Sequence, residues 1–578
     1  MAKTESKTKS ESKMVGTNSV DKGDPSSDVV SDPIRSLRWA VYAILICIAV
    51  GWSLGRIGSI STVEMVALQR ERMKGIPVEV DKLRVKLEGE QTPVVDADGK
   101  PVLAEDGTPK KRPYTPDEIA EKLGRKTTEL THKYEVLTRP FLSGNDRSRW
   151  CTARALVEPE MRVEGAPYAI DRVVQQPGWD TIDMVKHDDH LYSSKPPLFP
   201  TLLAGAYWCV CKVTGWTLGT HPFAVGRILL VLFNLVPLTF FFVVMAALAE
   251  RLARSDWARI FMVAAATMGT MLTTFVVVVN NHLPAAVTAA VTLYALVKIW
   301  LDDDRRWRWF FLAGLAAALV ASFELPGAAM LGGVGLLLLF VSPKKAFLAA
   351  LPAVMLVAIP YFVTNYVAHD SWRLPYMHRS ETDPSDNWYS YSYVRDGRTI
   401  RSYWENPQGN DRGEADRAKY AIHCLVGHHG VFSLTPIWAL SVLGLAIWLV
   451  RGDGRTRLMA AAILALSALI LYFYLVNRPE IDRNYGGMTC GLRWVFWLIP
   501  FWLVAMLPAL DLLDNAKYGE AMCSGGSGGW YRGWIKFGRA VVLTMLVVSI
   551  FSVVWPNNPW SDPWLEVFLN AAPTLWGV

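Results

Sequence analysis

Charged residues are scarce in this chain. Asp, Glu, Lys and Arg make up 19% of its 578 residues, against about 25% in soluble globular proteins, while apolar residues make up 51%. The seven cysteines show no metal-ligand or paired-disulfide spacing, and Cys209 and Cys211 lie in an apolar stretch where a packing role is expected. Neither an internal repeat nor a glycine-rich nucleotide-binding loop is evident. The scarcity of charged residues argues against a soluble protein. No nucleic-acid partner is expected.

Long apolar runs are what the sequence contains instead. Stretches such as "ILLVLFNLVPLTFFFVVMAALA" and "AAILALSALILYFYLV" reach or approach the ~20 residues that a helix needs to cross the hydrocarbon core of a membrane. A spanning segment must satisfy its backbone hydrogen bonds internally, so these runs predict helices rather than strands. The sequence therefore predicts an all-α polytopic membrane protein.

The positions of Lys and Arg predict the topology, because these residues concentrate on the cytoplasmic side. Arg35 and Arg38 stand at the start of the first span and place the N-terminus in the cytoplasm. About eleven spans are predicted, with the C-terminus outside, near 37–55, 224–248, 258–279, 282–300, 308–323, 326–342, 345–366, 432–450, 457–476, 493–511 and 537–555. The apolar segment 196–216 is predicted to be a re-entrant or interfacial helix that begins at two prolines, because counting it as a span would place three basic clusters outside.

The same pattern divides the chain. Residues 1–34 are polar and predict a disordered cytoplasmic tail, 35–366 an N-terminal transmembrane module, 367–431 an outer loop and 432–578 a C-terminal transmembrane bundle. The first outer loop holds an insertion at 60–138, followed by the loop 139–216. The insertion is expected to be a helical hairpin with a structural or docking role. A small β-hairpin with Asp-Gly turns and a capping box from Thr115 to Glu118 are predicted within it.

Ionisable residues at the ends of spans are functional candidates, and the first of them follow the insertion. Asp146 and Arg149 are three residues apart and share a face on a helix, and Lys195 stands at the start of the re-entrant helix. A surface ion pair is an equally good interpretation of the first two residues. Snorkelling of the lysine to the membrane surface is an alternative for the third.

Further polar residues are predicted at the same outer face. Asn280, Asn281 and His282 join two apolar segments, where a polar turn is the alternative to a site. His423, His428 and His429 precede a span with a spacing that matches no standard metal-ligand set, and Arg493 begins another span after a charged turn. Taken together, these segments indicate a membrane-embedded site for a charged amphiphilic substrate.

Several short motifs carry a family resemblance. "DRSRW" and "ARALVE" (146–158), "YSSKPPL" (192–198), "PFAVGR" (222–227) and "NHLP" (281–284) occur in this order. Their order and spacing resemble the lipid-linked-sugar-dependent membrane glycosyltransferases of the C superfamily, especially the aminoarabinose transferase and protein O-mannosyltransferase group. The resemblance covers roughly residues 37–60 and 140–345.

The resemblance implies a function and a set of roles. It implies inverting transfer of a sugar from a polyprenyl-phosphate-linked donor to a glycan, lipid or protein acceptor, at the outer face of a bacterial cytoplasmic membrane. Asp146 matches the catalytic carboxylate of the family, and Arg149 and Lys195 match the cations that hold the donor phosphate. Asn281, His282, His428, His429 and Arg493 are possible substrate or metal contacts.

The chain also departs from the family pattern. Arg147 follows the catalytic Asp where relatives often carry a second acid, Ser194 stands where aminoarabinose transferases have Glu, and Asn281 and His282 replace a later acid. A divalent metal ion held by His282 with Asp146 and a metal-free role of His282 are both open. A secondary transporter and a non-catalytic membrane scaffold are the alternative functions.

Overall fold

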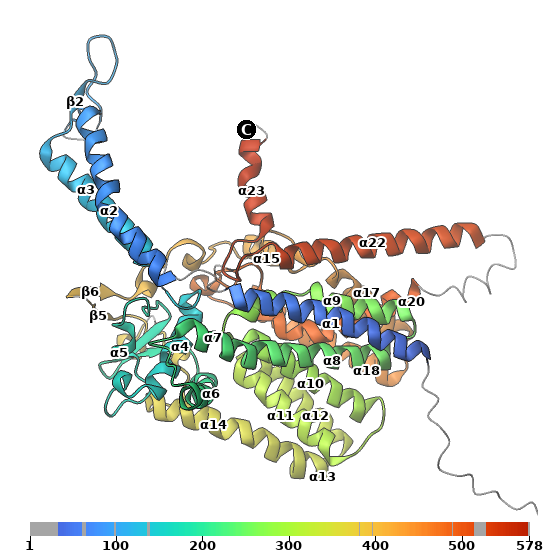
Figure 1. The fold of residues 1–578 in the computed structure, drawn as a ribbon. Helices are drawn as coiled ribbons and strands as arrows, with labels where there is room; N and C mark the ends of the chain where they lie inside the picture. The colour runs from blue at the N-terminus through green and yellow to red at the C-terminus, as the bar shows by residue number, and fades with distance from the viewer. Residues whose placement is uncertain are drawn as a thin grey trace, which may run out of the picture.

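The computed structural model is predominantly helical. It describes residues 33–59, 65–96, 100–135, 139–380, 382–395, 397–487, 489–513 and 528–575. The predicted disordered tail, apart from its last two residues, lies outside this part of the chain. Figure 1 shows a bundle of long helices with a group of short elements at one end and a pair of helices that projects away from it.

The helices are α1 (Pro33–Ser59), α2 (Met65–Gly89), α3 (Pro116–Glu135), α4 (Gly144–Val157), α5 (Asp171–Val174), α6 (Leu198–Thr214), α7 (Pro222–Leu230), α8 (Val236–Leu252), α9 (Asp256–Met268), α10 (His282–Trp300), α11 (Trp307–Phe323), α12 (Ala328–Val341), α13 (Pro343–Lys345), α14 (Leu351–His369), α15 (Arg417–Leu425), α16 (Val431–Leu434), α17 (Trp438–Arg451), α18 (Gly454–Leu475), α19 (Ile499–Ala505), α20 (Leu507–Leu512), α22 (Gly528–Val554) and α23 (Trp564–Leu575). The short segments η3 (Val231–Leu235), η4 (Thr274–Val277) and η12 (Arg493–Leu498) connect some of them. The strands pair as three antiparallel hairpins: β1 (Gln91–Pro93) with β2 (Lys111–Pro113), β3 (Met184–His187) with β4 (His190–Ser193), and β5 (Ser392–Arg395) with β6 (Arg398–Arg401).

Seven described helices are long and apolar enough to cross a membrane. They are Pro33–Ser59, Pro222–Leu252, His282–Trp300, Pro343–His369, Gly454–Leu475, Arg493–Leu512 and Gly533–Val554, and each overlaps a predicted span. The segments predicted near 308–323, 326–342 and 432–450 form shorter apolar helices, and so does the predicted re-entrant segment, as α6. The protein is thus helical, with apolar helices of the kind that cross membranes. Among the described residues, seven helices meet the criteria of length and composition, whereas about eleven spans were predicted.

The predicted span 258–279 is wrong as one continuous helix. Helix α9 ends at Met268, Gly269 follows as its C-terminal cap, and the chain continues through the 3₁₀ segment η4 to an extended Val278. The hydroxyls of Thr270 and Thr273 donate to backbone carbonyls three or four residues earlier, which competes with regular helix formation. Hydropathy alone did not indicate this break, because the segment remains apolar throughout.

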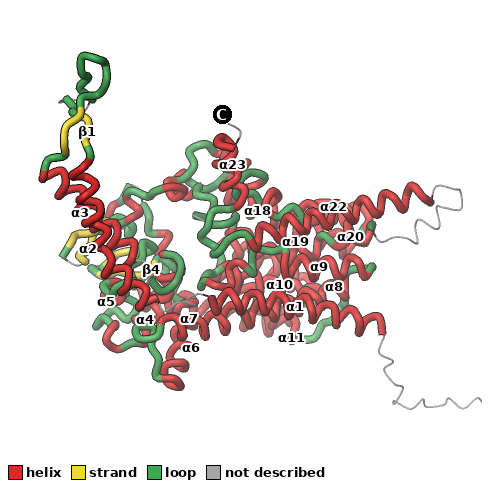
Figure 2. The backbone as a smooth tube through the Cα atoms, turned by 45° about the horizontal axis from the view of Figure 1, so that its top comes forward, coloured by secondary structure: helices red, strands yellow, loops and turns green. Residues whose placement is uncertain are grey.

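The insertion forms two helices and a small sheet that stand apart from the bundle (Figures 1 and 2). Helices α2 and α3 pack against each other along their length, with Ile76, Leu130 and Tyr134 buried between them. The predicted capping box is present: the Thr115 N–H donates to Glu118 Oε2 at 2.9 Å, and the Glu118 N–H donates to Thr115 Oγ1 at 3.3 Å.

A group of charged side chains joins α1 to α8 and α9. Arg38 donates to both carboxylate oxygens of Glu250 on α8, at 2.8 and 2.9 Å, and to Asp256 on α9 at 3.0 Å. The Tyr42 hydroxyl donates to Glu250 at 2.7 Å, and Arg259 donates to Asp256 at 2.9 Å. We call these five residues the Arg38 cluster. The cluster lies at one end of the bundle, where α8 ends and α9 begins.

Candidate functional site

Asp146 lies in the first turn of α4, fully buried. Ser143 caps this helix by accepting from the Asp146 N–H, and the turn directs the aspartate toward the break after α9. Asp146 Oδ1 accepts from the Val279 N–H at 2.8 Å and from Trp150 Nε1 at 2.9 Å. Its second oxygen, Oδ2, is buried without a hydrogen-bond partner in the described part of the chain. The carboxylate therefore has one oxygen fixed by the fold and one oxygen available.

The environment of Asp146 moves its protonation equilibrium toward neutrality. Burial raises the pKa of this carboxyl to about 6, although the hydrogen bonds from Val279 and Trp150 and the charge of Arg149 oppose the shift. Such a group is mostly ionised at neutral pH and still basic enough to accept a proton. These are the properties of a general base.

The broken segment between η4 and α10 forms one wall of the site. Asn234 donates to the carbonyls of Val276 and Val278, both at 2.8 Å, while Asp146 accepts from Val279. Asn280 Oδ1 accepts from the N–H groups of His282 and Leu283, at 2.8 and 3.2 Å, and so satisfies the start of α10. Buried backbone that is neither helix nor strand needs other groups to satisfy its hydrogen bonds, and these side chains do so here.

Arg149 lies on the same helix as Asp146 and extends to this wall. Its Nη2 donates to Asn281 Oδ1 at 3.0 Å, and its Nη1 donates to Asn145 Oδ1 at 2.6 Å. Burial lowers the pKa of Arg149 to about 10, so the guanidinium is still charged at neutral pH. Its Nε is buried without an acceptor among the residues that the structure places. A buried and incompletely paired cation of this kind is suited to an anionic ligand.

Lys195 joins the same network through a residue that the sequence did not single out. The β3–β4 hairpin pairs Met184 with Ser193, which brings Asp183 beside Ser194 and Lys195. Asp183 accepts from Lys195 Nζ at 2.9 Å and also from the Ser194 hydroxyl. Asn145 Nδ2 donates to Asp183 at 2.8 Å and so links Lys195 to Arg149. A carboxylate is therefore present next to Lys195, although Ser194 stands where the acid was expected.

The electrostatics of this pair follow from burial and contact. Burial opposes ionisation of Asp183, but Lys195 and the hydroxyl of Ser194 outweigh it and hold the pKa of the carboxyl below its ordinary value. Burial lowers the pKa of Lys195, and the nearby charges of Arg149 and Arg493 act in the same direction. Arg149, Lys195 and Arg493 thus act on one another electrostatically. Lys195 donates to the carboxylate of Asp183, whereas the hydrogen bonds of Arg149 and Arg493 go to neutral oxygens.

His282 and Arg493 complete the group. His282 Nδ1 lies 2.5 Å from Glu324 Oε1, and Glu324 follows α11 directly. The Arg493 guanidinium is held by its own Nε, which donates to the Gly486 carbonyl at 2.7 Å, and it stacks on Trp560 at 4.8 Å. We call Asp146, Arg149, Asp183, Lys195, Asn281, His282, Glu324 and Arg493 the Asp146 network.

Six of the eight residues predicted for the site belong to this network, and two do not. His428 and His429 lie together in a separate group with Glu566 of α23. Asp183 and Glu324 are the additions that the sequence analysis missed. Glu324 carried a signal, because it is a lone acid between two apolar stretches in "ALVASFELPGAAM". Asp183 carried none, because it stands in an ordinary polar segment and only the hairpin brings it to Lys195.

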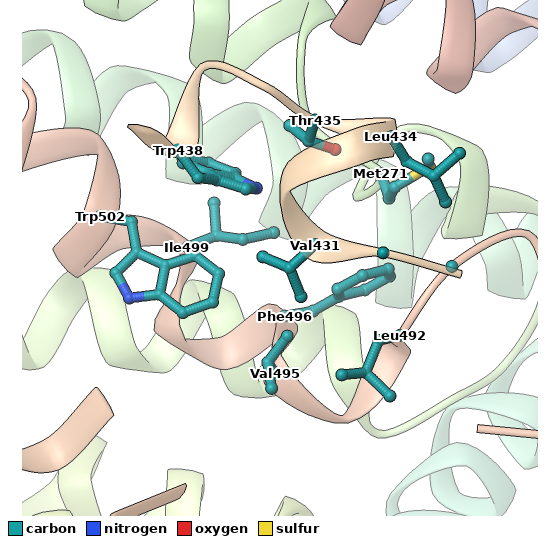
Figure 3. Close-up of a pocket in the computed structure, with 12 residues that line it drawn as sticks. Met271, Val431, Leu434, Thr435, Trp438, Leu492, Val495, Phe496, Ile499 and Trp502 are labelled. Atoms are coloured by element: carbon teal, nitrogen blue, oxygen red, sulfur yellow. The ribbon is translucent and has the colours of Figure 1, made fainter. Parts of the chain in front are cut away.

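An apolar pocket adjoins the network (Figure 3). Its lining consists mainly of large apolar side chains, among them Met271, Leu434, Trp438, Phe496 and Trp502. The Phe496 ring also faces the His282 ring, with centroids 6.3 Å apart. The apolar pocket and the charged network are therefore joined at Phe496 and His282.

Asp146 and His282, the residues predicted to share a metal ion, make other contacts. In the described ranges, the group of three or more His, Cys, Asp or Glu side chains with converging ligand atoms is His428, His429 and Glu566. The hydrogen bonds of Asp146 are with Val279 and Trp150, and His282 contacts Glu324 instead. A metal ion shared by Asp146 and His282 therefore stays a prediction, and no chemical step is assigned to it.

No protein-family model matches this chain, and no curated protein sequence matches it. The function is therefore argued from the geometry of the site and from the motifs.

Proposed function

We propose that this protein is a glycosyltransferase. It transfers a sugar, with inversion, from a polyprenyl-phosphate-linked donor to a glycan, lipid or protein acceptor at the outer face of a bacterial cytoplasmic membrane, with its N-terminus in the cytoplasm. One observation carries the proposal: Asp146, with a buried and unpaired Oδ2, belongs to the same network as Arg149, Lys195 and Arg493. The eleven-span topology is part of this proposal: the seven long helices, the three shorter helices near 308–323, 326–342 and 432–450, and the broken segment 258–279 cross the membrane, and α6 is re-entrant.

The chemistry assigns a role to each side of the network. Asp146 Oδ2 accepts the proton of the acceptor hydroxyl while that oxygen attacks the anomeric carbon of the sugar. The bond from the anomeric carbon to the phosphate oxygen breaks on the opposite face, and the polyprenyl phosphate leaves with the electron pair. A single displacement inverts the anomeric configuration.

The cations act on the leaving group. Negative charge develops on the phosphate as it departs, and preorganised charged donors stabilise it most in a site without water. Arg149, Lys195 and Arg493 supply this charge from three different elements. The lack of a glycine-rich nucleotide-binding loop, together with the apolar side chains that begin at Phe496 next to His282, favours a lipid-linked donor over a nucleotide sugar.

The decisive variant is Asp146→Asn. Asparagine keeps an oxygen that accepts from Val279 and Trp150, so the wall of the site stays in place, but it has no carboxylate to accept a proton. We expect transfer to fall roughly 10²- to 10⁴-fold, the usual contribution of a general base. Membranes of a strain that lacks the gene supply the unused lipid-linked sugar, and mass spectrometry of the product measures transfer by purified variants.

Asp256→Asn is the matched control, because it makes the same change at the far end of α9. It should transfer at the rate of the unchanged protein. The proposal is wrong if purified, folded Asp146→Asn transfers at that rate too, or if loss of the gene leaves every envelope glycan and glycolipid unchanged. The second result would favour the scaffold or transporter alternatives.

A further inference from the structure

A second polar group lies outside the proposed transferase site. His428 and His429 occupy the turn between α15 and α16, and Glu566 lies in the first turn of α23 near the C-terminus. His429 is 1% exposed, and the side chain of Glu566 is 20% exposed. The group therefore joins two segments that are more than a hundred residues apart in sequence, in a place that retains some access to solvent.

The ligand atoms of these three residues converge. The two Nδ1 atoms lie 2.5 Å apart, and Glu566 Oε2 lies 3.7 Å from that of His429 and 4.0 Å from that of His428. A proton shared between the imidazoles satisfies one pair only. Glu566 Oε2 is still buried without a hydrogen-bond partner among the described residues. Buried polar atoms are ordinarily paired, so this arrangement calls for a further partner.

A metal ion accounts for the convergence. Ligand atoms bound to a tetrahedral zinc ion at about 2.0–2.1 Å lie about 3.3 Å from one another. The observed separations lie on either side of this value, so small side-chain rotations suffice to surround an ion. Two imidazoles and one carboxylate suit zinc and similar transition metals, whereas magnesium and calcium prefer oxygen ligands.

We propose that His428, His429 and Glu566 form a binding site for one zinc-class divalent transition-metal ion, with a further position open to water. The ion would fasten α23 to the turn before α16. This proposal is independent of the transferase activity, because none of the three residues belongs to the Asp146 network.

The surroundings indicate what such an ion would stabilise. The Tyr485 ring stacks on His429, with centroids 5.3 Å apart, and the next residue, Gly486, holds Arg493 through its carbonyl. The same loop is tied to the segment before α23 by the Cys490 N–H, which donates to the Pro559 carbonyl at 3.0 Å. A bound ion would thus lie beside this loop and hold it together with α23.

The test is direct metal binding by the full chain. The protein is purified in detergent with a tag that contains no histidine, stripped with a chelator and titrated with Zn²⁺, and bound metal is measured by inductively coupled plasma mass spectrometry. We expect about one zinc ion per chain and, with Co²⁺ instead, the visible absorption of a four-coordinate site. His429→Gln and Glu566→Gln should each weaken binding more than about tenfold.

His132→Gln is the control, because His132 is an exposed histidine on α3. It should bind zinc like the unchanged protein, and Asp146→Asn should do so as well, which separates this site from the transferase site. Glu566→Gln changes one atom of a partly exposed side chain and keeps the proposal testable if His429→Gln does not fold. Failure of the unchanged chain to bind zinc, or equal binding by Glu566→Gln, overturns the proposal.

Discussion

Charged side chains gather at both ends of the bundle, and the two groups differ in how completely their carboxylate oxygens are hydrogen-bonded. In the Arg38 cluster, both oxygens of Glu250 accept from Arg38 and one also accepts from Tyr42. Among the described residues of this cluster, the buried side-chain atom without a partner is Arg259 Nε, which belongs to a cation and not to a carboxylate. In the Asp146 network, Asp146 Oδ2 and Arg149 Nε are buried without hydrogen-bond partners in the part of the chain that the structure describes. Both groups are largely buried, so burial alone does not separate them.

The difference indicates different roles. A bidentate pair that joins two helices contributes to the packing of those helices, and it leaves no capacity on its carboxylate for a ligand. Unpaired buried atoms cost free energy, so a fold retains them where a substrate or ion supplies the missing partner. We therefore expect changes in the Arg38 cluster to alter stability and changes in the Asp146 network to alter transfer.

The largest effect that would test this contrast is on stability. Arg38→Ala leaves Glu250 without its bidentate partner and should lower the free energy of unfolding by roughly 3–5 kcal/mol, as for other broken buried pairs. Unfolding in mixed micelles measures the change. Transfer per folded molecule should stay the same.

Arg35→Ala serves as the control for this variant, because Arg35 is an exposed arginine on the same helix. Its stability should match that of the unchanged protein. A strong loss of specific activity in folded Arg38→Ala would contradict the division of roles.

A smaller effect is expected for the donor. Lys195→Ala removes a charged hydrogen-bonding group from the proposed phosphate site and should lower kcat/KM for the lipid-linked sugar roughly 10- to 100-fold. Steady-state rates at varied donor concentration measure it. Lys186→Ala changes a lysine of the same hairpin that bonds to the Ser392 carbonyl and should have little effect. Equal donor dependence in both variants would remove Lys195 from the phosphate site.

The smallest effect concerns pH. The base must be ionised, and burial raises the pKa of Asp146 to about 6, so kcat/KM should be constant above this value and fall about tenfold by one pH unit below it. The rate falls toward low pH because protonation of Asp146 below pH 6 removes the acceptor for the hydroxyl proton. Asp146→Glu, if active, should move this inflection. A rate that rises as the pH falls through 6 would contradict a base at this position.

The motifs predicted the main charged residues of the site better than the acidic residues that contact them. Asp146, Arg149 and Lys195 were identified from short patterns, and the structure brings them into one network. Glu324 was detectable as a lone acid between apolar stretches, but Asp183 was not, because its role depends on the β3–β4 hairpin register. Whether the network performs the proposed transfer stays a prediction.

The fold shows the same division. Hydropathy located the seven described helices that are long and apolar enough to cross a membrane, because burial in hydrocarbon requires long apolar runs whatever the neighbours are. It did not indicate that 258–279 breaks after Met268, because the break is stabilised by Asn234 and Asp146, which lie far away in sequence.

The sequence by itself determined the helical membrane architecture and the residue types at the site, since both follow from local composition and spacing. The tertiary structure alone decided which charges meet. It pairs Lys195 with Asp183, sets His282 against Glu324 and brings His428 and His429 to Glu566. These contacts join residues that are distant in sequence, and their formation depends on packing and register rather than on the preferences of any one segment.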